Sequence, residues 1–331
     1  PATVRWLHHG QHRYGAADPR HITPSIYTFP YMREVESIRY SSRFPVARLE
    51  FEDSALPLEI GLEAYSYFLP GNAPDSGLPV ARLRYRVRNT TERPGHVCIS
   101  YTLRNFVGWD SIRELPLEHR LLRHDNCRTI LMRGSDELDP LAPSTGSLAL
   151  SLDDPDAGYL LAWSDGKGLA GFPNADTPGY GHFAQAMLAG ALPGGPEEWS
   201  RTCVPRSKTQ GEVKECCGST PIELHTWRGS LSSSFELLPG DERTVTFTIS
   251  WHFPNHIHYQ FPECRPGHHY ATRFDNAAEV AEYATREKER LEAGTQALVA
   301  CLSQSTLPDW FMDSLAAQLS IFPASTWWAA N

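Results

Sequence analysis

Pairs of acidic residues are the first candidates for chemistry in this 331-residue sequence. Asp153-Asp154 and Glu197-Glu198 each place two carboxyl groups side by side. Catalysis by two carboxyl groups needs environments that hold their pKa values apart, most often through burial of one of them. Both pairs lie among turn-forming residues, so we expect solvated side chains with ordinary pKa values. We therefore predict that neither pair is catalytic.

A second candidate is a group of imidazole and thiol side chains between residues 252 and 269. Its members are His252, His256, His258, Cys264, His268 and His269. Two histidines at i and i+2 on a strand, with a cysteine and a further histidine, can complete a tetrahedral zinc site. The alternative is a strand end and loop whose histidines form hydrogen bonds or face solvent. The sequence does not decide between these two alternatives. We predict the second, in which no metal is bound.

Tryptophan offers a third kind of site. Trp163, Trp199 and Trp227 could form a platform on which a sugar ring stacks, although tryptophan in a sheet more commonly packs in the core. The sequence contains no Walker A or HExxH motif. We therefore predict no cofactor.

Charge and cysteine content narrow the class of protein. A formal charge of −9 and a pI near 5.9 disfavour nucleic acid as a partner, because phosphate binding needs a basic surface. No apolar run approaches the roughly 18 residues of a transmembrane helix, and the first residues lack the features of a signal peptide. Seven irregularly spaced cysteines fit reduced thiols better than a disulfide framework. We expect a cytoplasmic protein without a transmembrane segment.

Short strands dominate the sequence up to about residue 253. Apolar and polar residues alternate in many runs, and a period of two residues indicates strands with one buried face. The clearest run alternates Leu83, Tyr85 and Val87 with Arg82, Arg84, Arg86 and Arg88. We expect all four arginines to lie on a face of the strand that contacts water. Many such strands without helices between them predict a mainly β protein, a large antiparallel β-sandwich. Residues 165–220, rich in Gly, Pro and Ser, predict long loops.

From residue 275 onward the pattern changes to that of a helix. Apolar residues recur about every 3.5 positions through residue 303, which predicts one long helix. Asp275 or Asn276 supplies its N-cap, and Gly294 is its weakest point.

A second helix is predicted after residue 305. Ser305 or Thr306 would cap it, and Pro308 would lie in its first turn. Its apolar stripe and the tryptophans beyond it are Phe311, Leu315, Leu319, Phe322, Trp327 and Trp328. So much apolar surface is not expected to stay exposed. The helix should therefore dock on the sandwich or begin a helical domain.

Several segments, in this order, resemble the N-terminal region of glycoside hydrolase family 116, which includes bacterial β-glucosidases and non-lysosomal glucosylceramidases. They are 44–53 (FPVARLEFED), 62–72 (LEAYSYFLPGN), 75–80 (DSGLPV), 88–90 (RNT), 105–109 (NFVGW), 247–255 (FTISWHFPN), 270–274 (YATRF) and 307–310 (LPDW). The resemblance spans most of residues 30–328.

The resemblance implies three parts: an N-terminal β-sandwich (supersandwich) at 1–274, a long linker helix at 275–304, and at 305–331 the first helix of a truncated (α/α)6 barrel. In that family a Glu nucleophile and an Asp acid/base in the barrel hydrolyse β-glucosides or glucosylceramide-like substrates with retention of configuration. Both would lie beyond this chain, so we predict that it is inactive by itself and abuts a helical catalytic domain in cis. The alternative is a stand-alone carbohydrate-binding or interaction sandwich without hydrolase activity.

The segment 62–76 (LEAYSYFLPGNAPDS) is unusually aromatic for a loop. A sandwich that holds a helical barrel needs an aromatic-rich contact, so we predict a domain seam here. The predicted seam or barrel-facing residues are Tyr65, Tyr67, Phe68, Asp75, Trp327 and Trp328. The alternative is an ordinary strand end followed by a bulged turn.

Overall fold

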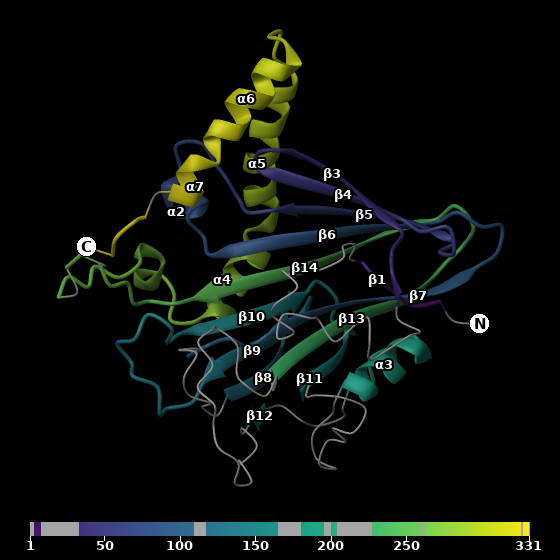
Figure 1. Ribbon diagram of the computed structural model, residues 1–331, viewed down its shortest axis with the longest axis horizontal. Coiled ribbons are helices and arrows are strands. Elements are labelled where there is room, and N and C mark those ends of the chain that lie inside the picture. Colours follow the sequence, from purple (N-terminus) through teal and green to yellow (C-terminus); the bar gives the residue numbers. More distant parts are fainter. Residues whose placement is uncertain are drawn as a thin grey trace, which may run out of the picture.

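Two antiparallel β-sheets face each other in the computed structural model of the protein, and helices lie against the larger sheet and beyond its edge (Figure 1). The structure describes residues 3–7, 33–108, 117–164, 180–194, 200–203, 227–258, 260–261, 263–325 and 327–330. The predicted mainly β sandwich is confirmed.

The larger sheet has the strand order β12-β8-β9-β10-β14-β6-β5-β4-β3. Its strands are β3 (Ser37–Arg43), β4 (Val46–Glu52), β5 (Leu58–Tyr65), β6 (Val80–Asn89), β8 (Leu117–Arg123), β9 (Arg128–Gly134), β10 (Ser147–Leu152), β12 (Ser200–Cys203) and β14 (Glu242–His252). The smaller sheet, β11-β13-β7, contains β7 (Gly95–Arg104), β11 (Gly158–Ser164) and β13 (Trp227–Leu237). A short parallel pair joins β1 (Arg5–Trp6) to β2 (Arg33–Glu34).

The central core lies between the two sheets. On β6, Tyr85 and Val87 are buried in this core, and Tyr85 is paired in register with Leu62 of β5 and Val245 of β14. The alternation predicted for β6 is therefore confirmed for its apolar face. Its arginines point to the outer face of the larger sheet, but Arg82 is fully buried there, which contradicts the expectation that all of them face water.

Helices α4 (Ala277–Arg286) and α5 (Lys288–Ser303) replace the single predicted helix. The Asn276 side chain caps α4 by accepting bonds from two backbone N–H groups, as predicted. The break falls at Glu287, which has φ −92° and ψ 9°, and not at Gly294. Small residues of α4, Ala277 and Ala278, pack on β9 and β10, whereas α5 crosses the sheet farther along. The spacing of apolar residues could not predict this break, because it does not show that α4 and α5 pack on different parts of the sheet.

Helix α3 (Tyr180–Ala189) lies within the stretch predicted to be loops. Phe183 stacks on Trp163 with ring centroids 4.9 Å apart, and Ala184 and Leu192 complete this small core. The loop prediction is therefore wrong for 180–189, and also for 200–203, which form strand β12 of the larger sheet. The apolar residues of α3 are few and lie in one short segment, so the sequence could not show that they pack on Trp163 of β11.

Helices α6 (Asp309–Leu319) and α7 (Ile321–Ser325) follow α5, and α5 with α6 forms a hairpin that projects past the β3 edge (Figure 1). Pro308, not Ser305 or Thr306, occupies the N-cap of α6. The buried residues of α6 are Met312 and Ala316. The short elements α2 (Ala73–Ser76) and η2 (His269–Thr272) lie in connections. No helix in the described ranges is long and apolar enough to cross a membrane.

A buried histidine should make the sandwich sensitive to acid. His119 on β8 is fully buried, and its Nδ1 is 2.8 Å from the Leu161 carbonyl oxygen of β11, so it links the two sheets. Burial lowers the pKa of His119 from 6.5 to about 4. As pH falls below 6.5, His119 therefore becomes protonated in the unfolded chain but stays neutral in the folded chain. The free energy of unfolding declines as a result, until pH reaches about 4 and His119 is protonated in both states.

We expect His119 to contribute a loss of about 3 kcal/mol in the free energy of unfolding across this window, at 1.36 kcal/mol per pKa unit. His119→Gln retains an N–H donor but does not titrate, so its unfolding free energy should decline less between pH 7 and pH 4.5. Urea denaturation at each pH measures this, with the exposed His124→Gln as control. Identical acid slopes for wild type and His119→Gln would contradict the prediction.

Candidate functional site

The aromatic segment after β5 covers helix α5. Tyr65 and Tyr67 are buried with their rings at 6.0 Å in an edge-to-face arrangement. The Tyr65 hydroxyl donates to Glu292 Oε1 at 2.9 Å, and the backbone N–H of Phe68 donates to Thr295 Oγ1 at 3.2 Å. With Val46, Val80 and Leu291, these tyrosines form a second core between sheet and helix. We call this contact the helix seam.

A close approach of backbone to side chain tightens the helix seam. A Cβ atom on Gly294 would lie 2.7 Å from Leu69 Cδ2 and 2.8 Å from Leu69 Cγ. Such distances are far below contact, so only glycine allows α5 to lie this close to residue 69. Gly294 is therefore a packing requirement of α5, although its low helix propensity makes it look like a weak point in the sequence.

Asp75 fixes the other end of the helix seam. Its carboxylate accepts bonds from the Tyr283 hydroxyl at 2.8 Å, from Arg290 at 2.7 Å and from the Asn72 side chain at 2.8 Å. Burial acts to raise the pKa of Asp75, but the bonds from Arg290, Tyr283 and Asn72 outweigh it and hold the pKa below its usual value. Asp75 is therefore a fixed anion that joins α2 to α4 and α5.

A fully buried arginine lies beneath the helix seam. Arg82 donates to Thr248 Oγ1 at 2.5 Å and to Asp153 Oδ2 at 2.9 Å, and Glu292 lies 3.7 Å away. Lys288 also reaches Asp153, at 3.1 Å. Burial disfavours the charged guanidinium, but Asp153 more than compensates and raises the pKa of Arg82 above its usual value. These residues, which come from β6, β14, α5 and the turn after β10, are called the Arg82 network.

Asp153 is not the solvated turn carboxylate that the sequence suggests. Its side chain is 17% exposed and is held by Arg82 and Lys288. Asp154 accepts a hydrogen bond from Ser233. Glu197-Glu198 lies outside the described residues. The sequence signal that could have located the Arg82 network is weak, because Arg82 has the same position in the alternation as its exposed neighbours.

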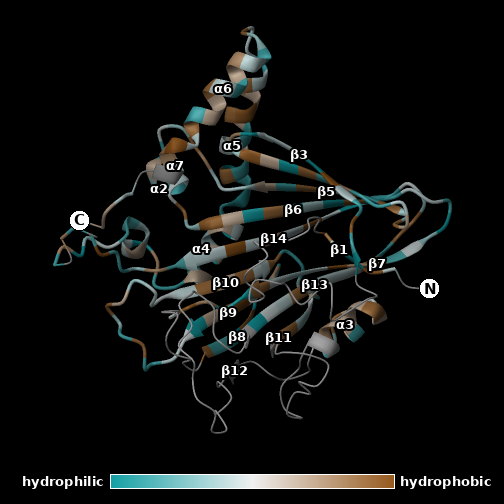
Figure 2. Cartoon of the chain, in the orientation of Figure 1, coloured by the Kyte–Doolittle hydropathy of each residue, from teal (hydrophilic) through white to brown (hydrophobic). Residues whose placement is uncertain are grey.

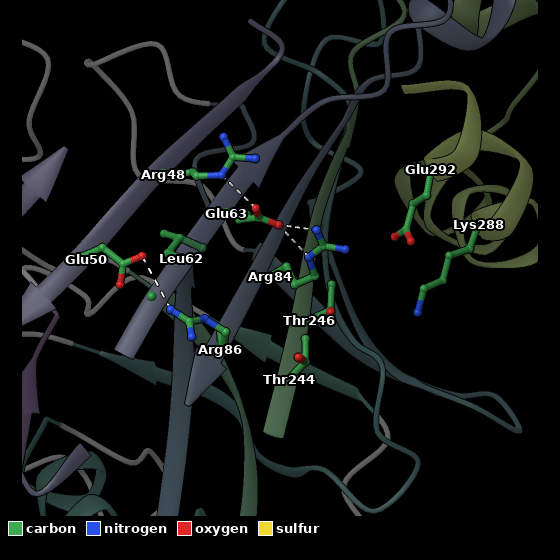
Figure 3. A pocket seen from close by; sticks show the side chains of 11 residues that line it. Arg48, Glu50, Leu62, Glu63, Arg84, Arg86, Thr244, Thr246, Lys288 and Glu292 are labelled. Carbon is green, nitrogen blue, oxygen red and sulfur yellow. Dashed lines mark hydrogen bonds and ion pairs between the residues drawn. The ribbon is translucent and has the colours of Figure 1, made fainter. Parts of the chain in front are cut away.

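A polar groove opens on the outer face of the larger sheet beside the Arg82 network (Figure 3). It encloses about 580 Å³. Its lining residues are Arg48, Glu50, Gly61, Leu62, Glu63, Arg84, Arg86, Thr244, Thr246, Lys288 and Glu292. Strands β4, β5, β6 and β14 form the floor, and α5 forms one wall with Lys288 and Glu292. This arrangement is called the outer groove.

Glu63 is the central anion of the outer groove. Arg48 Nε donates to it at 3.0 Å from β4, and Arg84 Nε donates at 3.1 Å from β6. Partial burial would raise the pKa of Glu63, but the bonds from Arg84 and Arg48 lower it below its usual value. A carboxyl group that stays ionised in this way can accept hydrogen bonds but cannot serve as a proton donor near neutral pH.

The histidine-rich stretch forms a stacking surface for the C-terminal tryptophans. Trp328 stacks on His269 with ring centroids 3.4 Å apart and planes at 4°, and Trp327 lies 4.2 Å from the His256 ring. Trp327 Nε1 donates to the Gly267 carbonyl oxygen at 3.2 Å. No group of three or more potential metal ligands gathers within the described residues. We call this contact the tail clasp.

The predicted seam residues separate into two places. Tyr65, Tyr67 and Asp75 lie in the helix seam, covered by elements of this chain. Phe68 packs edge-on against Phe44 at 4.9 Å. Trp327 and Trp328 lie in the tail clasp and are 39% and 44% exposed. Contact of these residues with another domain stays a prediction.

The tight contact between Gly294 and Leu69 predicts that the effect of Gly294→Ala on stability changes sign when Leu69 is removed. Gly294→Ala should destabilise the protein by about 1–3 kcal/mol, because its Cβ must displace Leu69. In a Leu69→Ala background the same change should stabilise by up to about 1 kcal/mol, the usual gain of alanine over glycine in a helix. Urea unfolding of the four proteins measures both effects. Equal effects in the two backgrounds would show that Leu69 does not restrict Gly294.

The Arg82 network predicts unequal costs for its two ion pairs. Asp153→Asn leaves a buried guanidinium without its main carboxylate and should cost about 3 kcal/mol. Lys288→Ala, at a side chain that is 40% exposed, should cost less than about 1 kcal/mol. Denaturant midpoints of the two variants provide the comparison. If Lys288→Ala proves as costly as Asp153→Asn, the central role of Arg82 is wrong.

Comparison with known proteins identifies the family to which this chain belongs. A family model described as beta-glucosidase 2, glycosyl-hydrolase family 116 N-term, matches residues 17–291. The match runs through the sandwich and α4 and ends at Leu291 in α5, so it includes the strands that form the floor of the outer groove but stops before Glu292. A search of curated proteins found no match. The chain belongs to glycosyl-hydrolase family 116 and carries the N-terminal domain of that family.

Proposed function

We propose that this chain is the non-catalytic N-terminal domain of a retaining β-glucosidase or glucosylceramidase-type hydrolase, and that it supports a helical catalytic domain in cis. The proposed division is a sandwich at 1–274, a linker at 275–304 and the start of the catalytic domain at 305–331. The helix pair α4–α5 supports this linker assignment, because it connects the sandwich to the projecting α6.

The observation that carries the proposal is the apolar surface of α6 and α7. Trp310 is 70% exposed, Phe322 56%, Ile321 51% and Leu315 42%. Figure 2 shows hydrophobic residues along α6, in the hairpin that projects beyond the sheets, and along α7, which follows it. Large apolar side chains exposed in this number on two consecutive helices are typical of a surface that another domain covers. The expected partner is a helical domain, since α6 continues directly from the linker.

The carboxylates of the sandwich support the assignment of catalysis to a different domain. Retaining hydrolysis needs a proton donor with a raised pKa beside a nucleophilic carboxylate. Asp75 and Glu63 show the opposite shift, with pKa values held below their usual range by arginine partners. Both therefore serve as fixed anions in packing and ion pairing.

Two further features bear on the alternatives. Trp163 is buried and donates to Ser230 Oγ at 2.8 Å, so it is not part of a sugar-stacking platform on the surface. Trp199 and the side chain of Trp227 lie outside the described residues. The described cysteines Cys98, Cys127, Cys264 and Cys301 are free thiols, which supports the proposed cytoplasmic location.

The proposal predicts that this chain binds a separately expressed helical catalytic domain of family 116 and does not itself hydrolyse an aryl β-glucoside. Trp310→Ser with Phe322→Ser should weaken that binding at least tenfold, because tryptophan at the centre of an interface is commonly worth about 2 kcal/mol or more. Calorimetric titration measures the affinity, with Arg39→Ala on β3 as control. Turnover by this chain alone, or unchanged affinity of the double variant, would count against the proposal.

A further inference from the structure

We propose that the outer groove is a binding site for a neutral polyhydroxylated ligand, of which a sugar with vicinal hydroxyl groups is the simplest example. The inference rests on the lining, charge balance and rigidity of the groove. It goes beyond the proposed function and does not depend on it, because the site lies wholly within this chain.

The charge of the outer groove selects against ions. Its lining has four basic side chains, Arg48, Arg84, Arg86 and Lys288, and three acidic ones, Glu50, Glu63 and Glu292. The two signs alternate across the floor: Glu63 lies between Arg48 and Arg84, and Arg86 is 3.7 Å from Glu50. An anion or a cation in the groove would therefore meet repulsion as well as attraction, whereas a neutral ligand meets neither.

The functional groups of the groove match those of a polyol. A hydroxyl group both donates and accepts, so neighbouring hydroxyls are best bound where donors and acceptors alternate. Guanidinium groups present several N–H donors in one plane, and carboxylates accept at two oxygens. Thr244 and Thr246, on adjacent outward positions of β14, add two hydroxyls beside Arg84 and Arg86. The volume of about 580 Å³ lies within the range of small-molecule sites.

The charged groups are held in place before any ligand arrives. Glu292 accepts a bond from Tyr65 at 2.9 Å and lies 3.7 Å from the buried Arg82. Lys288 is tied to Asp153 at 3.1 Å. The wall of the groove is therefore fixed by the Arg82 network, and ligand binding need not order these long side chains, which lowers the entropic cost of binding.

A glycine creates the space in the floor. The outward positions of β5 on either side, Glu59 and Glu63, carry long side chains, but the position between them is Gly61. A Cβ atom on Gly61 would lie 3.0 Å from Glu50 Oε2 and 3.2 Å from Glu50 Oε1. Any larger side chain would occupy the groove and displace the Glu50 carboxylate, so glycine keeps the recess open.

The test is a titration of the whole chain with cellobiose, followed through the threonine methyl signals in NMR. We expect saturable shifts at Thr244 and Thr246 with a dissociation constant on the order of 1 mM, because no aromatic ring lines the groove to add stacking. The methyl signals of Thr102 and Thr145, which lie elsewhere, should not move. Inorganic phosphate at the same concentration should leave Thr244 and Thr246 unchanged.

Gly61→Val should weaken cellobiose binding at least tenfold. The matched control is Gly95→Val on β7, where an added Cβ meets nothing within 4 Å, and it should bind as wild type does. If Gly61→Val does not fold, Thr246→Val takes its place, since it keeps the shape of the side chain, removes one hydroxyl and should weaken binding severalfold. Absence of saturable shifts, preference for phosphate, or wild-type affinity in the groove variants would each overturn the proposal.

Discussion

The buried charge of Arg82 is the constraint on which the arrangement of this domain depends. A guanidinium enclosed by protein is costly unless partners surround it, and here those partners come from separate parts of the chain. Thr248 is on β14, Asp153 follows β10, and Glu292 is on α5. Because all of them must converge on one side chain of β6, α5 has one favoured position on the outer face of the sheet. Tyr65 and Tyr67 pack over the same point and exclude water from it.

The two surfaces to which we assign functions both depend on that position of α5. Lys288 and Glu292 form the wall of the outer groove, and each is also bonded into the Arg82 network. The same helix leads into the projecting α6, whose apolar side chains form the proposed contact with a catalytic domain. A shift of α5 would therefore change the shape of the groove and the direction of the hairpin together. This coupling is mechanical, through one rigid helix.

The hairpin is also tied to the sandwich through α6 and through the segment that follows α7. Arg43 of β3 pairs with Asp313 of α6 at 2.7 Å, and the tail clasp returns the chain to the loop before η2. Backbone bonds reinforce the clasp: the N–H of His269 donates to the Trp328 carbonyl oxygen at 2.9 Å, and that of Ala330 to the Pro266 carbonyl oxygen at 3.1 Å. The histidines that suggested a metal site from their spacing here provide flat surfaces for tryptophan rings.

The sequence by itself determined the strands with one buried face and the family, and it narrowed the cap of α4 to Asp275 or Asn276, because these depend on local periodicity and on residue order. It could not separate Arg82 from Arg84, since both occupy outward positions on β6 and only the helix above makes one buried and the other part of the groove. It also could not place the break at Glu287 or the roles of Gly61 and Gly294. Tertiary structure decided these features, because a strand pattern specifies which way a side chain points but not what lies above it.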